Sequence, residues 1–526
     1  MITDLNDHCS ATIREADVCI IGAGTAGLTL VGELLPARLK IVVLESGGHE
    51  VEERTQKLYD CELVGLPHRG HIEGRFRVLG GTSTRWGGQL LPLTPHDIEE
   101  RNWIGAEAWP VKYADLVPHY RRVEKMFEVD EQPYDLSMPN ALPVELPRFD
   151  TAVFSARYAK WPSFARRNLA VLMRETYTGS DQVEIILHAN VNTLASGASA
   201  GHIGEVQAKS FSGATVRVRA KYVVVSMGTL ETIRLLLNSG KAAEQGIGNH
   251  SGWLGRNFQD HLSMRAAELT PDCPEQFERS FAPFFIGSTM RTARLELSPK
   301  VQRERSLLSC FGQVLFETPD DSGFVELREA LRRLQRGRNP LPGRAGWLHV
   351  LRDLPYMCRL GYSRYVKRRV AYPDNARFYL QVDVEQQPNH ESRVTLSDRR
   401  DEFGMPVMRL DWRVGEAEKQ TLQQYVSMFR QEWERLRLGG GRWNESILGD
   451  GNGWLKDAVD VFHQTGGTRM SVDPDHGVVD SSLRVHGTRN LFVASCSVFP
   501  TAGSANPTFT LLALTVRLAD HIRASV

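Results

Sequence analysis

Two residues near the carboxyl end of the chain, His463 and Asn506, have the chemistry to remove a proton and to hold an oxygen atom. His463 precedes a glycine turn in FHQTGGTRM, and Asn506 opens NPTFTLLALTVRLADHI, which predicts a helix with Asn506 at its N-cap and Pro507 at the first helical position. Imidazole, with a pKa of about 6.5, suits a general base, whereas an amide orients an oxygen but is a poor base. We therefore predict that His463 is the proton acceptor. The capping role alone would also explain Asn506.

A dinucleotide-binding motif lies near the amino terminus. The apolar run 18–21 predicts a buried parallel strand, and it is followed by glycines in GxGxxG spacing at the start of a helix, namely Gly22, Gly24 and Gly27. The positive end of that helix would point at phosphates. A second apolar run, 41–44, ends in Glu45, at the position of the acid that binds an adenosine ribose. This order predicts a dinucleotide site, argues against NADP, and leaves FAD and NAD open.

A second glycine-rich loop, 77–90, is suited to a phosphate or to the edge of a flat cofactor. It contains four glycines, three hydroxyl residues and one tryptophan. The alternative is an ordinary surface turn, because most loops only connect elements. A large aromatic side chain between glycines indicates packing on something flat or buried. The predicted cofactor contacts in this loop are Gly80, Gly81, Thr82, Ser83, Trp86 and Gly87.

Composition limits the class of partner. The 526 residues predict two to four domains, and equal numbers of basic and acidic residues, 63 each, give a formal net charge of zero. This balance disfavours nucleic acid as the partner and favours a small molecule. The seven cysteines form no CxxC pair, and no run of about 18 apolar residues or leader-like segment occurs. We expect a cytoplasmic protein without a transmembrane segment and without a metal site.

Taken together, the motifs resemble those of the glucose/methanol/choline (GMC) oxidoreductases, and within that family the bacterial branch near pyranose oxidases and sugar dehydrogenases. The matching segments occur in the family's order over nearly the whole chain. They are GAGTAG (22–27), ESGG (45–48), LGGTSTRWGG (79–88), YVVVSMGTLETIRLLLNSG (222–240), LGRNFQDH (254–261), FHQTGGTRM (462–470) and LFVASCSVFPTAGSANPT (491–508).

This resemblance implies bound FAD and assigns the contacts. The first three glycines would meet the pyrophosphate, Glu45 the ribose, and the 80–88 loop the isoalloxazine, with Val191, Gly228, Ser495, Pro507 and Thr508 as further cofactor contacts. Ser495 stands where many members have an acidic residue, so the ribityl contact would be weaker or made by backbone. Arg85 stands where some pyranose oxidases have a histidine bonded to the flavin, so we expect noncovalent FAD. His463 and Asn506 match the two catalytic positions.

The same resemblance implies a Rossmann-like FAD domain (1–100, 180–265 and 455–526) and a substrate domain built on an antiparallel sheet (101–179 and 266–454). The fold class is therefore α/β plus α+β. A helix is predicted within 109–129, and an alternating pattern over 376–398 predicts strand. Glu385, Gln386 and Gln387 could bind substrate hydroxyls, although exposed polar groups on a strand are the commoner explanation. The Arg-rich segment 328–369 reads as a solvated helical insertion; a lid, a protein-docking face or a membrane-surface patch stays open.

The predicted function is FAD-dependent oxidation of an alcohol, on a sugar, glycoside or sugar-derived metabolite, with oxygen or another electron acceptor. Three alternatives remain at this stage. One is a lyase of the same fold that holds flavin without redox turnover, the second is a noncatalytic binding protein, and the third is an NAD dehydrogenase.

Overall fold

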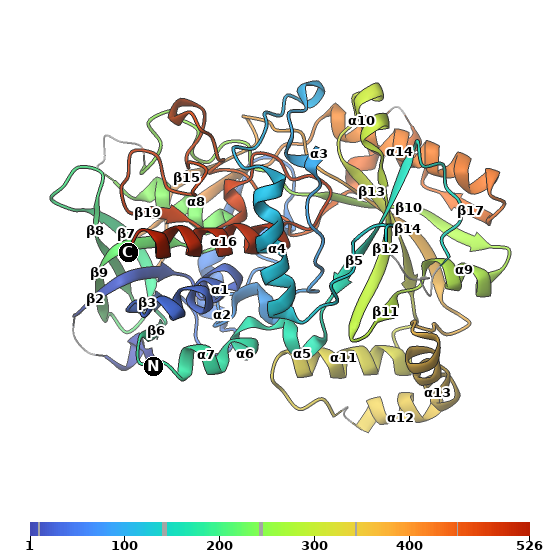
Figure 1. Cartoon of the computed structure of the whole chain (residues 1–526), viewed down its shortest axis with the longest axis horizontal. Coiled ribbons are helices and arrows are strands. Elements are labelled where there is room, and N and C mark those ends of the chain that lie inside the picture. The colour runs from blue at the N-terminus through green and yellow to red at the C-terminus, as the bar shows by residue number, and fades with distance from the viewer. Residues whose placement is uncertain (9–10, 139–144, 241–245, 342–343, 450) are drawn as a thin grey trace.

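Segments from the beginning, middle and end of the chain form one eight-stranded sheet, on the left of Figure 1. The computed structural model describes residues 1–8, 11–138, 145–240, 246–341, 344–449 and 451–526. The strand order is β1-β6-β3-β2-β9-β8-β7, and β19 also pairs with β9. The strands are β1 (Ile2–Asp4), β2 (Thr12–Ile21), β3 (Ile41–Leu44), β6 (Val183–Leu187), β7 (Asn190–Ser196), β8 (Ile203–Lys209), β9 (Thr215–Val225) and β19 (Leu491–Val493).

The predicted elements of the dinucleotide motif are present in this sheet. The run 18–21 is the buried end of β2, and β3 covers the second predicted run and is buried throughout. These strands pair in parallel, which explains why both read as continuous apolar runs rather than alternating ones. Helix α1 (Thr25–Leu34) follows β2, and α8 (Thr229–Asn238) follows β9. The sheet therefore places two strand-to-helix turns at the same edge.

A second sheet, of antiparallel strands, forms the right half of Figure 1. Its order is β11-β12-β13-β14-β10-β17, with β5 paired to β12 and β18 to β10. The strands are β5 (Phe154–Trp161), β10 (Leu262–Pro271), β11 (Phe284–Ile286), β12 (Thr289–Leu297), β13 (Cys310–Glu317), β14 (Arg377–Val384), β17 (Gly439–Trp443) and β18 (Val459–Asp460). Helix α14 (Glu416–Arg435) packs against β13 and β14. The fold class is thus α/β plus α+β, as predicted, whereas the proposed division of the chain into domains stays a prediction.

The alternating segment 376–398 contains two strands rather than one. Its first part is β14, but its second part begins β15 (Arg393–Arg400), which pairs with β16 (Pro406–Asp411) and through it with β4 (Cys61–Leu63) in a separate three-stranded sheet. Of the polar residues between the two strands, Glu385 and Gln386 are almost fully buried rather than exposed. Alternation reports a half-buried strand but does not say which sheet the strand joins.

Helices cover the sheets and fill the space between them. α16 (Pro507–Ala524) packs against α1 and α4 (Tyr113–Phe127), and α4 is the helix predicted within 109–129. The short helices are α2 (Glu53–Gln56), α3 (Pro95–Ile98), α5 (Phe164–Arg167), α6 (Leu169–Leu172), α7 (Arg174–Thr178), α9 (Pro274–Phe281), α10 (Pro299–Arg305) and α15 (Glu445–Leu448).

The Arg-rich insertion is helical. It consists of α11 (Gly323–Gln335), α12 (Arg344–Arg352), α13 (Leu354–Tyr362) and a π-helical turn (Ser363–Lys367), which lie along the lower edge of Figure 1. Among the described residues, no helix has both the length and the apolar character needed to cross a bilayer. The cytoplasmic location inferred from the cysteines stays a prediction.

Candidate active site

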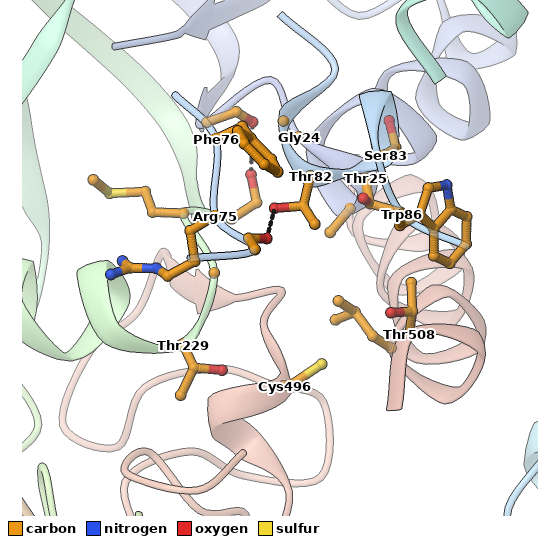
Figure 2. Close-up of a pocket in the computed structure, with 18 of the residues that line it drawn as sticks. Gly24, Thr25, Arg75, Phe76, Thr82, Ser83, Trp86, Thr229, Cys496 and Thr508 are labelled. Atoms are coloured by element: carbon orange, nitrogen blue, oxygen red, sulfur yellow. Dashed lines mark hydrogen bonds between the residues drawn. The ribbon is translucent and has the colours of Figure 1, made fainter. Parts of the chain in front are cut away.

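A cavity of about 520 Å³ lies where the two sheets meet, and segments from both ends of the chain line it. Figure 2 shows Thr82, Ser83 and Trp86 on one side, with Thr229, Cys496 and Thr508 across from them. The structure thus brings together most of the residues predicted from sequence. Those that line the cavity are Gly22, Gly24, Glu45, Gly81, Thr82, Ser83, Trp86, Gly87, Val191, Gly228, His463, Asn506, Pro507 and Thr508.

The two glycine-rich segments touch each other at the cavity wall. A methyl group built on Gly81 would lie 2.9 Å from the Cα of Gly24, and the backbone N–H of Gly80 donates to the carbonyl of Ala23 at 2.9 Å. Gly22 has a φ of 101°, which side chains other than glycine rarely adopt. Glycine is therefore required at position 81 by close backbone contact and at position 22 by backbone conformation, and both residues line the cavity.

Three predicted cofactor residues lie outside the lining, and each has a structural role instead. A methyl group on Gly27 would come within 2.0 Å of the carbonyl oxygen of Gly22, so Gly27 lets α1 pack against the turn. Gly80 ties the loop to Ala23. Ser495 is fully buried and its hydroxyl accepts from the N–H of Ser497 as a helix cap, while its neighbours Ala494 and Cys496 line the cavity.

The hydroxyls of the 80–88 loop mostly bond within the loop. Ser83 Oγ donates to the carbonyl of Gly80 at 2.5 Å, and Thr84 Oγ1 donates to that of Gly81 at 2.9 Å. The indole N–H of Trp86 donates to the carbonyl of Arg167 at 2.7 Å. The hydroxyl protons of Ser83 and Thr84 therefore fix the loop's shape, while the cofactor contact predicted for Ser83 stays a prediction.

Glu45 is buried at the end of β3 and binds the backbone of two turns. Its carboxylate accepts from the N–H of Ala23 at 2.8 Å and of Gly47 at 2.9 Å. Burial raises its pKa, and the two backbone N–H groups and Arg77 oppose that rise. Glu45 thus holds the first glycine turn in place as well as facing the cavity.

A buried charge cluster that sequence reasoning missed lines another part of the cavity. Glu231, in the first turn of α8, accepts from Arg77 at 2.7 Å and from Arg75 at 3.2 Å. Both guanidinium groups lie over the ring of Tyr59: that of Arg75 is 3.9 Å and that of Arg77 is 4.4 Å from the ring centre. Burial alone would raise the pKa of Glu231, but Arg77, Arg234 and Arg75 outweigh burial and hold it at about 2. No motif in the sequence connects residues 75–77 with 231.

Backbone pairing brings two sequence motifs together at His463. Gln259 and Thr465 exchange backbone hydrogen bonds of 3.0 and 2.9 Å, so LGRNFQDH lies beside FHQTGGTRM. The buried carboxylate of Asp260 accepts from the N–H of His261 and from that of His463, each at 2.8 Å. His261, which the sequence analysis left without a role, is thereby fixed next to His463.

The described residues contain one group that could hold a metal ion, made of His68, Asp260 and Asp460. Its oxygen atoms already have protein partners. Asp260 Oδ2 pairs with His68 Nε2 at 3.1 Å, and Asp460 accepts from the N–H groups of Arg69 and Gly70. We interpret this group as a structural support, in which Asp260 holds the backbone N–H groups of His261 and His463.

Hydrogen bonding defines the tautomer of His463. His261 Nε2 lies 2.7 Å from the carbonyl oxygen of Gly503, and a carbonyl only accepts, so His261 carries its proton on Nε2. Its Nδ1 must then accept from His463 Nδ1, 2.9 Å away, when both rings are neutral. The Nε2 atom of His463 therefore carries no proton, and its lone pair accepts a hydrogen bond from the amide nitrogen of Asn506 at 2.9 Å.

Arg294, on β12 of the second sheet, fixes the orientation of Asn506. A guanidinium can only donate, and its Nη2 lies 3.0 Å from Asn506 Oδ1, so the amide must turn its NH₂ group toward His463. Arg294 also donates to Gln89 and to the carbonyl of Ser504, and it lies 3.6 Å above the ring of Phe311. Although Asn506 is the N-cap of α16, its side chain makes no capping bond. The capping explanation is therefore wrong for the side chain.

The electrostatic setting keeps His463 neutral. Burial lowers its pKa well below the usual value of 6.5, and the nearby His261 and Arg294 add to this effect. Burial also lowers the pKa of Arg294, to about 10, so Arg294 stays charged at neutral pH. The result is an unprotonated Nε2 atom facing an amide N–H at the cavity wall.

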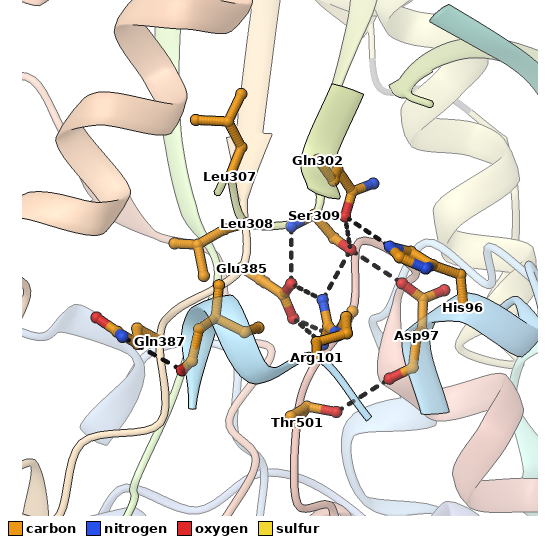
Figure 3. Close-up of polar contacts among 12 residues, drawn as sticks. His96, Asp97, Arg101, Gln302, Leu307, Leu308, Ser309, Glu385, Gln387 and Thr501 are labelled. Atoms are coloured by element: carbon orange, nitrogen blue, oxygen red, sulfur yellow. Dashed lines mark hydrogen bonds and ion pairs between the residues drawn. The ribbon is translucent and has the colours of Figure 1, made fainter. Parts of the chain in front are cut away.

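A second buried ion pair supports the same region from behind (Figure 3). Arg101 donates to Glu385 through both terminal guanidinium nitrogens, and its Nη2 lies 3.1 Å from Glu385 Oε2. The carboxylate also accepts from the N–H of Gly503 at 2.8 Å, and the carbonyl of Gly503 is the acceptor for His261. Glu385 is thus connected to the histidine pair, and it acts through the loop before α16 rather than on a substrate hydroxyl.

Comparison with known proteins agrees with this architecture. A family model described as GMC oxidoreductase matches residues 170–263, and a second with the same description matches residues 388–515. The 2-methyl-1,2-propanediol dehydrogenase of Mycolicibacterium austroafricanum is 24% identical and aligns over 97% of this chain and 95% of its own length. The paromamine 6′-oxidase of Streptomyces fradiae is also 24% identical, and it aligns over 97% of this chain and 91% of its own length.

Among solved structures, a formate oxidase of Aspergillus oryzae RIB40 superposes with a TM-score of 0.60 at 16% identity, over 98% of this chain and 99% of that one, and so shares the fold. Two matching family models, full-length relatives and a shared fold lead to one conclusion. The chain belongs to the GMC oxidoreductase family, and it is an FAD-dependent oxidoreductase.

Proposed function

We propose that this enzyme oxidises an alcohol group of a sugar, glycoside or related polyol, with His463 as the base that takes the hydroxyl proton. The observation that carries the proposal is the unprotonated Nε2 atom of His463, held 2.9 Å from the amide nitrogen of Asn506 at the wall of the cavity. A base and a hydrogen-bond donor side by side are what an alcohol oxygen needs in order to lose its proton.

The residues at the cavity fit FAD. The turn at Gly22 and Gly24 and the start of α1 would hold the pyrophosphate, and Glu45 would meet the ribose. The N-terminus of α16, at Pro507 and Thr508, also faces the cavity, where its dipole favours negative charge. When bound, FAD supplies the acceptor for a hydride.

The protein's own part in the reaction is orientation and proton transfer. A substrate hydroxyl would replace the hydrogen bond between Asn506 Nδ2 and His463 Nε2: it would donate its proton to His463 Nε2 and accept a hydrogen bond from Asn506 Nδ2. A hydride would leave the carbon that bears this hydroxyl and pass to the cofactor, so that the alcohol becomes a carbonyl. The displaced proton stays on an imidazole whose Nδ1–H is already held by His261.

Two relatives support a substrate with several polar groups, since one is named for 2-methyl-1,2-propanediol and the other for paromamine. The cavity also has polar side chains in addition to the catalytic pair, including Gln89, Thr229 and Gln464. Each of these groups already has a protein partner: Arg294 for Gln89, the carbonyl of Gln464 for Thr229, and the carbonyl of Gly70 for Gln464. Their remaining hydrogen-bonding positions could bind hydroxyls of a sugar.

The test is to purify the protein, record its visible spectrum, and follow the flavin band anaerobically with a panel of sugars, glycosides and simple alcohols. We expect bleaching by at least one polyhydroxylated substrate. The His463→Ala variant should keep the flavin band, but its flavin should be reduced by substrate at least 100-fold more slowly, since the base is lost and the cofactor contacts remain. Unchanged reduction in this variant would remove His463 from its role. A yellow protein that no alcohol bleaches would favour the non-redox lyase.

A further inference from the structure

Exposed apolar side chains concentrate on the helical insertion. Of the nineteen large apolar side chains exposed in the described part of the chain, nine lie between Leu334 and Val366. Leu348 and Leu351 are 67% and 61% exposed, and Tyr365 is 81% exposed. Single exposed apolar residues need no explanation, but a contiguous group indicates an interaction site.

These side chains follow a helical stripe. Within α12, and again from α13 into the π-helical turn, the exposed positions recur at intervals of three or four residues apart from two adjacent pairs, so each of these helical segments presents an apolar side. The stripe consists of Trp347, Leu348, Leu351, Leu354, Cys358, Tyr362, Tyr365 and Val366. α11 lies between α12 and the rest of the molecule in Figure 1, so α12 forms the outer edge.

The same segment carries a strong positive charge although the whole chain is neutral. Residues 323–369 contain twelve arginines and lysines but only three acidic residues. Several of the cations pair with acids, as Arg352 does with Asp321 and Arg359 with Asp374. Arg336, Lys367 and Arg368 form no ion pair with any described residue. The apolar stripe is thus bordered by basic groups.

A second cavity, of about 300 Å³, opens at the end of α11 and is lined by four arginines: Arg85, Arg174, Arg336 and Arg338. Burial lowers the pKa of Arg85, and the positive charges of Arg336 and Arg338 lower it further, so these guanidinium groups are close together. Glu50, which pairs with Arg338, is the one carboxylate in the lining. The cavity has the charge to accept a phosphate group.

We propose that this edge, formed by α11–α13, the π-helical turn and the arginine-lined cavity, docks the enzyme on an anionic membrane surface. Trp347, Tyr362 and Tyr365 suit the boundary between headgroups and acyl chains, and the leucines would enter the acyl region. The basic side chains would meet lipid phosphates. A docked helix of this kind lies on the bilayer and needs no spanning segment.

Docking would place the cofactor loop near the lipid. Gln335, the last residue of α11, donates from Nε2 to the carbonyls of Ser83 and Trp86, at 3.3 and 3.0 Å. Arg85 lines both the arginine-lined cavity and the active-site cavity. The membrane-facing edge is therefore in direct contact with the loop that lines the active site.

The test uses the full-length, flavin-loaded protein in flotation with vesicles of phosphatidylcholine alone or mixed with phosphatidylglycerol. We expect flotation with the anionic vesicles only, weakened by added salt. Leu348→Ser with Leu351→Ser should lower the vesicle affinity at least tenfold, and Lys367→Gln with Arg368→Gln by roughly fivefold per charge removed. Val472→Ser and Arg442→Gln, at exposed sites outside the insertion, are the matched controls.

Flavin content and alcohol-dependent bleaching, measured without vesicles, should be the same in all these variants, which separates this proposal from the proposed function. No flotation with anionic vesicles would overturn it. So would flotation that the leucine and lysine–arginine variants leave unchanged. A dimer in solution that the leucine variant dissociates would show that the stripe instead binds a second copy of the chain.

Discussion

Arg294 acts on His463 in two ways, because it orients Asn506 and because its charge opposes protonation of the imidazole. In Arg294→Met the cation is gone, so protonation of His463 becomes easier and its pKa rises. The base form is then lost at a higher pH, and the acid limb of the flavin-reduction rate should move upward. The rate itself should fall roughly 10- to 100-fold as the amide loses its orientation.

Anaerobic stopped-flow measurement of flavin reduction across the acid range checks this, with Arg294→Lys as the control that keeps the charge. The lysine variant should lose rate but retain an acid limb well below pH 6.5, as in the wild type. An acid limb in Arg294→Met that coincides with that of the wild type would show that Arg294 does not set the protonation of His463.

The sequence was enough to select His463 and Asn506, because both lie in short motifs with a chemical meaning. It could not select His261 or Arg294. These residues lie 202 and 212 positions away from the partners they contact, and only the pairing of Gln259 with Thr465 and the position of β12 bring them together. Nor could the sequence show that the hydroxyl proton of Ser83 is used within its own loop, by the carbonyl of Gly80.

At the scale of elements, the ion cluster of Glu231 with Arg75 and Arg77 joins α8 to the segment before the glycine loop. The folded-state pKa of about 2 lies below the ordinary value of 4.5 for a glutamate, so this carboxylate stabilises the fold above pH 4.5. Its contribution should be lost as the pH falls from 4.5 toward 2. Glu231→Gln leaves two buried guanidinium groups without their partner and should lower the free energy of unfolding by about 3–5 kcal/mol.

Urea denaturation between pH 7 and pH 3 checks the prediction for Glu231. The difference in stability between wild type and Glu231→Gln should be largest at neutral pH and shrink in acid. Glu402→Gln, which removes an exposed partner of Arg54, is the matched control and should change little. If the two variants were equally stable at pH 7, the buried cluster would have no role in holding α8.

Elements were more predictable than their pairing. β3 matches the predicted run residue for residue, and α16 begins at Pro507, the predicted first helical position, because both have strong local patterns. The segment 376–398 also has the strand pattern, yet β14 and β15 join different sheets. Local alternation fixes which face is buried, whereas sheet membership depends on partners far away in the sequence.

At the scale of the whole molecule, the cavity depends on both halves of the fold at once. Its lining comes from the turns after β2 and β9, from the 80–88 loop, and from the segment before α16, while Arg294 reaches Asn506 from the second sheet. The cavity that we propose for FAD therefore depends on the arrangement of both sheets. A ligand that binds the folded chain alone stabilises it by about 2.7 kcal/mol at 100 times its Kd.

We therefore expect protein stripped of flavin to unfold at a lower temperature than the reconstituted enzyme, by several degrees at saturating FAD. Far-ultraviolet circular dichroism would follow both sheets during heating, and the visible flavin band would follow release of the cofactor. Because the cavity lies between the sheets, loss of the flavin band and unfolding of both sheets should occur together. If FAD bound with its usual spectrum but only part of the circular dichroism transition moved, the cofactor would stabilise one sheet alone, and the contact from Arg294 to Asn506 would not couple the two halves.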